Sequence, residues 1–181
     1  MQKREPANSI QIKHCVGIFK FTLLAIALLV SIYLIIIRLN DATLNVSEVQ
    51  FSTITGQQIA LKSLQGKPVI VTFWATTCPE CLKEIPLLID LYQQFHSKGL
   101  EIIAVAMSYD PPNHVIAMAN ELQLPYAIAL DLNAEIAYTF GDIQLTPSTF
   151  LIRPDDSIET HYLGAFNISE LTSRIETLIK G

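Results

Sequence analysis

The chain has 181 residues, a formal net charge of −5 and three cysteines, and half of its residues are hydrophobic. This length leaves room for one compact domain plus an extension. The acidic balance argues against a nucleic-acid partner, because phosphate binding needs a basic surface, and three cysteines are too few for a disulfide scaffold.

The amino-terminal region contains a long apolar run. From Phe21 to Ile37 it reads FTLLAIALLVSIYLIII without a charge, and flanking apolar residues bring it near the about 20 residues that span a bilayer. A buried helix of a soluble protein would keep a polar face. A cleaved signal is the remaining alternative, although residues 38–41 offer no small-x-small cleavage site. We therefore predict a single transmembrane anchor at residues 18–39.

Cations lie mainly before this run, at Lys3, Arg4, Lys13 and Lys20, whereas Arg38 follows it closely. The positive-inside rule then places residues 1–17 in the cytoplasm and the rest of the chain across the membrane. For a bacterium, this predicts a single-pass protein of the inner (cytoplasmic) membrane with its domain on the periplasmic or extracytoplasmic side.

A short polar linker is predicted at residues 40–47, and one domain at residues 44–181. Residues 1–43 hold five of the 12 Lys and Arg and two of the 17 Asp and Glu, so the part beyond them carries a formal charge of −8. The domain opens with a predicted hairpin whose strands cover residues 46–51 and 58–61.

The next run, residues 68–74, is apolar throughout and predicts a buried central strand. It leads into Cys78-Pro79-Glu80-Cys81. Apolar residues then recur at helical spacing to Phe95, which predicts a helix that Pro86 interrupts and Gly99 ends.

The remaining chain alternates between strand and helix patterns. Strands are expected at 100–107, 126–130, 148–152 and 158–163, and helices at 113–122, 133–140 and 168–180, the last with Ser169 near its start. This order predicts an α/β fold with a central mixed sheet flanked by helices, parallel in its first part and with an antiparallel hairpin at its edge.

The pair Cys78 and Cys81 is the strongest chemical signal. A Cys-x-x-Cys between a strand and a helix puts the first sulfur at the helix amino terminus, where the thiolate is favoured. Cys78 is therefore the predicted nucleophile and Cys81 the resolving cysteine. A structural zinc site would need two further ligands, and the histidines are isolated, so we predict no metal and no cofactor.

Two stretches, VTFWATTCPECLKEIP at residues 71–86 and LTPSTFLI at residues 145–152, resemble the TlpA/ResA/DsbE-type branch of the thioredoxin superfamily. The similarity covers about residues 44–181 and implies a thioredoxin-like fold. It also implies a cis peptide bond before Pro147, with the backbone of Thr146 facing an extended substrate.

Further roles follow from the resemblance. Glu84 matches an acidic residue near the active site and is expected to tune or shuttle the cysteine protons, although a solvated helix carboxylate is an equal alternative. Trp74 is expected to pack beside the site, with contact to substrate as a second possibility. Thr72 stands where thioredoxin has a buried Asp, and Thr77 where many relatives have Trp.

The dipeptide Pro79-Glu80 between the cysteines is expected to tune the redox pair. A negative charge at Glu80 should disfavour the Cys78 thiolate and raise the pKa of that thiol. We therefore expect a reductant more than an oxidant.

The leading hypothesis is a thiol-disulfide oxidoreductase that reduces disulfides in exported proteins with electrons from a membrane thiol carrier. Apocytochrome c maturation is the task that the resemblance favours. A Cu(I) chaperone using the same cysteines, with His161 or Met107 as a further ligand, is one alternative. A thiol peroxidase is another, but the pattern Pro-x-x-x-Thr-x-x-Cys is missing.

Overall fold

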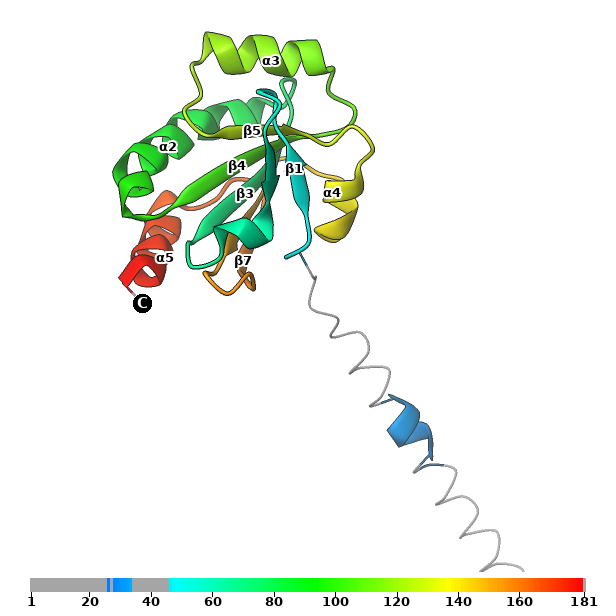
Figure 1. Ribbon diagram of the computed structural model, residues 1–181. Coiled ribbons are helices and arrows are strands. Elements are labelled where there is room, and N and C mark those ends of the chain that lie inside the picture. The colour runs from blue at the N-terminus through cyan, green and yellow to red at the C-terminus, as the bar shows by residue number, and fades with distance from the viewer. Residues whose placement is uncertain (1–25, 27, 34–45, 181) are drawn as a thin grey trace, which may run out of the picture. The chain divides into compact units, whose positions relative to one another are not determined.

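The computed structural model describes residues 26, 28–33 and 46–180, and divides the chain into two units, Met1–Thr43 and Leu44–Gly181 (Figure 1). In the first unit, residues 26 and 28–33 are helical. Within the described ranges, no helix combines the length and apolarity that a membrane crossing requires. Residues 1–17, most of the anchor predicted at 18–39 and most of the linker predicted at 40–47 lie outside these ranges.

The second unit alternates strands and helices as the sequence predicts. Its elements are β1 (Gln50–Ser52), β2 (Gln58–Ala60), η1 (Leu61–Leu64), β3 (Val69–Trp74), α2 (Pro79–Phe95), η2 (His96–Lys98), β4 (Glu101–Ala106), α3 (Pro112–Glu121), β5 (Ala127–Leu130), α4 (Glu135–Thr139), β6 (Ser148–Ile152), β7 (Ile158–Leu163) and α5 (Ile168–Lys180).

Five strands form one mixed sheet in the order β5-β4-β3-β6-β7. β3, β4 and β5 are parallel, while β6 and β7 run antiparallel to their neighbours. The hairpin β1-β2 forms a separate two-stranded sheet, which meets the edge of β5 through a bridge between Thr53 and Ala129. The predicted thioredoxin-like α/β fold with a mixed central sheet is therefore confirmed.

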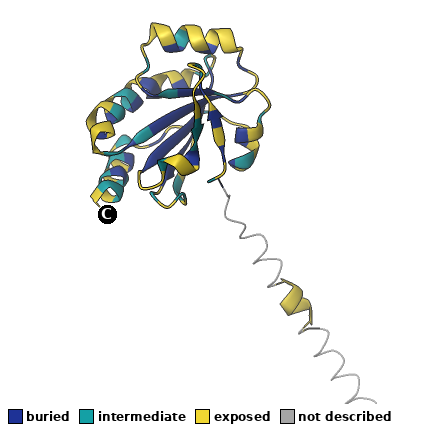
Figure 2. Cartoon of the chain, viewed as in Figure 1, coloured by how far each residue is buried: buried dark blue, intermediate teal, exposed yellow. Residues whose placement is uncertain are grey.

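Each face of the sheet buries its own apolar cluster, and the strands are dark with buried residues in Figure 2. On one face, residues such as Ile70 and Trp74 of β3 pack with α2, α3 and α5. On the other, Val71 and Phe73 pack with α4 and the β1-β2 region. Because side chains alternate along a strand, adjacent residues of β3 serve opposite clusters.

The observed bounds depart from the predicted ones mainly in the first hairpin. Its first strand is only Gln50–Ser52, because Val49 donates its amide to the carbonyl of Val46 in a turn. At the other end of the domain, α5 is capped by Asn167, whose side-chain oxygen accepts the Glu170 amide at 3.1 Å. Ser169, which the sequence places near the helix start, lies inside the first turn, and Asn167 is the capping residue.

Candidate active site

Cys78 lies at the amino-terminal cap of α2, directly after the loop that follows β3. Its backbone is extended, and its sulfur accepts the amide of Cys81 at 3.2 Å. Pro79 occupies the first turn of the helix, where a missing amide costs no hydrogen bond. This position lets the unpaired helix amides and the helix dipole stabilise a thiolate at Cys78.

The two cysteines are joined as a disulfide, with their Cα atoms 5.3 Å apart. Their exposure differs: Cys78 is partly exposed, whereas Cys81 is only 3% exposed. An external sulfur can therefore reach Cys78, while Cys81 is accessible mainly through its partner. This asymmetry fits the predicted roles of nucleophile and resolving cysteine.

Glu84 lies one turn after Cys81 and is 4% exposed. Its carboxyl oxygen Oε1 accepts the backbone amide of Phe166 at 3.0 Å. Burial raises the pKa of Glu84 from 4.5 to about 7, the Phe166 amide partly opposes this rise, and the charge of Glu80 adds to it. The alternative that Glu84 is a solvated helix carboxylate is therefore wrong.

Glu84 and the resolving cysteine both line a cavity of about 10 Å³, whose lining also includes Thr72 and Trp74. Such a volume holds about one water molecule. Cys81 and Glu84 therefore border the same small volume, and the role of Glu84 in moving the Cys81 proton stays a prediction.

Trp74 forms part of the same cavity and is 4% exposed. Its indole nitrogen has no hydrogen-bond partner within the described part of the chain. The burial of Trp74 supports the predicted packing beside the redox site. It leaves almost no Trp74 surface for contact with a substrate, the second possibility that the sequence offered. Nearby, the hydroxyls of Thr72 and Thr149 lie 2.8 Å apart, so these two buried groups satisfy each other.

The loop before β6 reaches the same end of the sheet. The bond between Thr146 and Pro147 is cis, as the resemblance implied. Because Phe73 near the end of β3 pairs with Ser148, Pro147 adjoins the strand end from which the cysteine loop leaves. Thr146 is partly exposed and Pro147 is buried, so Thr146 is the member of this pair that an incoming chain can contact.

A third segment, the loop after β4, is hydrogen-bonded to the loop that precedes Cys78. The buried carboxylate of Asp110 accepts the Thr76 amide at 2.6 Å and the Thr76 hydroxyl at 2.7 Å. Next to it, the hydroxyl of Tyr109 lies 3.5 Å from that of Thr146. Sequence reasoning assigned neither Tyr109 nor Asp110 to the site, because no local pattern signals contacts across 34 and 37 residues.

Glu80 is exposed, and its carboxylate lies 2.6 Å from the ammonium group of Lys83. Taken alone, the negative charge of Glu80 would disfavour a thiolate at Cys78. The ion pair with Lys83 offsets part of this charge, so the influence of Glu80 on Cys78 is weaker than a lone carboxylate would exert.

The proposed copper ligands do not gather at the cysteines. Met107 and Phe150 belong to the apolar cluster on the face opposite Cys81. His161 stacks on Phe150 with ring centroids 4.0 Å apart and bonds to Ser148. Among residues 26, 28–33 and 46–180, no three His, Cys, Asp or Glu side chains form a metal-binding group.

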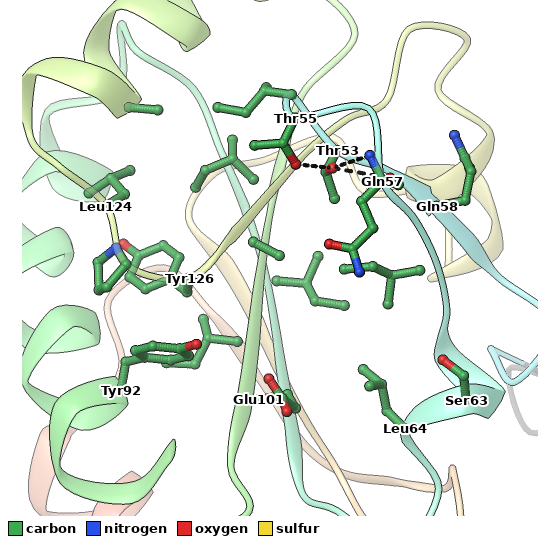
Figure 3. Close-up of a pocket in the computed structure, with 18 of the residues that line it drawn as sticks. Thr53, Thr55, Gln57, Gln58, Ser63, Leu64, Tyr92, Glu101, Leu124 and Tyr126 are labelled. Carbon is green, nitrogen blue, oxygen red and sulfur yellow. Dashed lines mark hydrogen bonds between the residues drawn. The ribbon is translucent and has the colours of Figure 1, made fainter. Parts of the chain in front are cut away.

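A larger cavity, of about 540 Å³, lies elsewhere on the domain (Figure 3). It is lined by the starts of β4 and β5, by Tyr92 and Tyr126, and by polar side chains of the β1-β2 hairpin such as Gln57. The cysteines follow the opposite end of β3, so this cavity is not part of the redox site. Leu124 and Tyr126 line both this cavity and the small one beside Glu84.

The geometry agrees with comparisons to known proteins. The Redoxin family model matches residues 41–179. The thiol-disulfide oxidoreductase ResA of Oceanobacillus iheyensis is 34% identical over 140 residues, which cover 75% of this chain and 70% of that protein. ResA of Bacillus thuringiensis subsp. konkukian is 39% identical over 106 residues, 57% of this chain, and the match spans only 58% of that relative's length.

Two solved structures show the same fold. StoA from Bacillus subtilis superposes with a TM-score of 0.61 at 25% identity, covering 69% of this chain and 93% of that one. A thiol:disulfide interchange protein of the thioredoxin family from Chlorobium tepidum gives a TM-score of 0.66 at 22% identity, covering 72% of this chain and 92% of that one.

Proposed function

Because the chain belongs to the Redoxin family, in the branch that contains the ResA proteins, we propose that it is a thiol-disulfide oxidoreductase working through Cys78 and Cys81. One observation carries this proposal: a partly exposed cysteine at a helix amino terminus is bonded to a buried cysteine one turn further on. This arrangement supplies both an accessible attacking sulfur and a protected resolving sulfur.

In the reducing direction, the Cys78 thiolate attacks one sulfur of a substrate disulfide, and the other substrate sulfur leaves as a thiolate. Cys81, after losing its proton, then attacks the Cys78 sulfur of the mixed disulfide and releases the second substrate thiolate. The two substrate thiolates each take up a proton, and the protein is left with the Cys78–Cys81 disulfide. Glu84 supports the second step by accepting the Cys81 proton within their shared cavity.

The proposed substrates are disulfides in exported proteins, and the proposed electron donor is a membrane thiol carrier that restores the Cys78–Cys81 dithiol. The name thiol-disulfide oxidoreductase of the ResA relatives supports this class of reaction. Apocytochrome c is the substrate that we favour within this class, on the resemblance to the TlpA/ResA/DsbE-type branch.

The test uses the reduced full-length chain and a synthetic peptide with one internal disulfide. The wild-type chain should reduce the peptide with matching loss of its own thiols. Cys78→Ser should abolish the reaction, whereas Cys81→Ser should accumulate a mixed disulfide at Cys78, visible by mass spectrometry. A Cys78→Ser chain as active as the wild type would refute the proposal.

We also propose that residues 18–39 anchor the chain in the bacterial inner membrane with the domain outside the cytoplasm. The uncharged run and the excess of cations before it support this placement. Alkaline phosphatase fused after Gly181 should be active, and the chain recovered from membranes should keep its full mass of 20.2 kDa. An inactive fusion, or a chain shortened by its first 40 or so residues, would contradict the placement.

A further inference from the structure

We propose that Tyr109, together with Leu145, selects the substrates of the redox site by binding an apolar side chain next to the substrate cysteine. This inference rests on the proposed oxidoreductase function and adds a specificity determinant to it.

Tyr109 is placed between the two loops that flank the redox site. Its neighbour Asp110 is held by two short hydrogen bonds to Thr76, which lies two residues before Cys78. Its own hydroxyl lies 3.5 Å from the hydroxyl of Thr146, the residue preceding Pro147. A chain that approaches Cys78 along Thr146 therefore passes the Tyr109 ring.

The Tyr109 side chain is 58% exposed and that of Leu145 is 64% exposed. Single exposed apolar residues are ordinary, but these two both adjoin Thr146, the residue that an incoming chain can contact. The loop that carries Tyr109 is already ordered before a substrate binds, because Asp110 is buried and also donates its amide to the carbonyl of Met107 at 2.9 Å. A preformed surface costs little ordering entropy on binding.

The chemistry of these side chains identifies the occupant. A phenol ring and a leucine side chain offer apolar contact and one hydroxyl, but no charge. The partner is therefore a polypeptide with a leucine-like or aromatic side chain beside its cysteine, and not a small charged thiol such as glutathione.

The experiment compares two cyclic disulfide peptides with the reduced full-length chain. One peptide carries Leu and Phe beside its cysteines, and the other carries Ser at the same positions. The wild type should reduce the apolar peptide about tenfold faster, the usual scale for one apolar contact. Tyr109→Ala should remove most of this preference, whereas Tyr109→Phe should keep it.

Tyr138→Ala is the matched control, because this tyrosine lies on α4 and is 75% exposed. It should leave the preference unchanged. Wild type and Tyr109→Ala should be reduced by dithiothreitol at the same rate and should have the same reduction potential. If Tyr109 had only a structural role, its loss would change these two properties as well.

Equal rates for the two peptides with the wild type, or an equal loss for both peptides and dithiothreitol in Tyr109→Ala, would overturn the inference. Loss of the preference in Tyr109→Phe would overturn the assignment to the ring. Failure of the wild type to reduce either peptide would instead count against the oxidoreductase function itself.

Discussion

Glu84 is a carboxyl group held inside the protein beside the resolving cysteine. Its pKa is raised from 4.5 to about 7, mainly because burial disfavours the charged form. The folded protein therefore holds this proton more tightly than the unfolded chain does. The resulting stabilisation is complete below about pH 4.5 and is lost as the pH rises through 7.

The prediction is a difference in pH dependence between wild type and Glu84→Gln. Relative to the glutamine variant, the oxidised wild type should lose on the order of 2–3 kcal/mol of unfolding free energy between pH 5 and pH 8. Urea unfolding at both pH values measures this loss. Parallel pH profiles for the two proteins would show that Glu84 is ionised in the folded state throughout this range.

Glu84→Gln also separates the catalytic role of Glu84 from its structural one. Glutamine keeps an oxygen that can accept the Phe166 amide but cannot take a proton from Cys81. If the variant folds normally, its mixed disulfide should therefore resolve more slowly near neutral pH.

Glu80 and Lys83 give a second prediction at the residue scale. Removing the charge in Glu80→Gln should stabilise the Cys78 thiolate and so raise the reduction potential. Because Lys83 lies 2.6 Å from the carboxylate, the rise should be small, on the order of 10 mV. It should be larger in a Lys83→Gln background, where Glu80 is unpaired. A fall in potential, or equal shifts in both backgrounds, would contradict this account.

At the scale of elements, β3 and β6 are joined inside the sheet by two hydroxyls. Thr72 and Thr149 pair across the strands and lie 2.8 Å apart with both side chains buried. Thr72→Val leaves the Thr149 hydroxyl buried without its partner and should cost about 1–3 kcal/mol of unfolding free energy. The double variant with Thr149→Val removes both hydroxyls and should recover most of that loss. Additive losses in urea unfolding would show that the pair is not coupled.

The elements themselves follow closely from sequence. The strands at residues 148–152 and 158–163 and the helix at 168–180 have the predicted bounds, because apolar spacing and turn residues mark them locally. The first hairpin was less predictable, since its strands have three residues each and such short segments carry little periodicity.

The site was only partly predictable for a related reason. Cys78 and Cys81 lie three residues apart in the sequence, and this spacing alone indicates a redox pair. The burial of Glu84, in contrast, depends on a segment that includes Phe166, 82 residues away. The hydrogen bonds between Thr76 and Asp110 join residues that are 34 positions apart in the sequence. No local sequence pattern encodes such distant partners. The burial of Glu84 and the position of the loop that carries Tyr109 therefore became visible only in the folded structure.

At the scale of the whole molecule, the domain carries an excess of acidic residues, and its redox site has the exposed ion pair of Glu80 and Lys83 beside the cysteines. Removal of the first 43 residues leaves a formal charge of −8, which favours the approach of basic polypeptides over acidic ones at low salt. The reduction potential of the Cys78–Cys81 pair determines whether the protein acts as a reductant or an oxidant toward a given substrate. The exposed carboxylate of Glu80 and the buried carboxyl group of Glu84 lie near this pair, and neither supplies a positive charge that would stabilise a thiolate.

The reduction potential of the Cys78–Cys81 pair tests the central claim most directly. The full-length chain would be equilibrated against dithiothreitol or glutathione buffers, and the fraction of disulfide measured by thiol labelling. A reductant of the proposed kind should show a potential near or below about −250 mV. A value near −120 mV would mark an oxidase and contradict the proposed direction of catalysis.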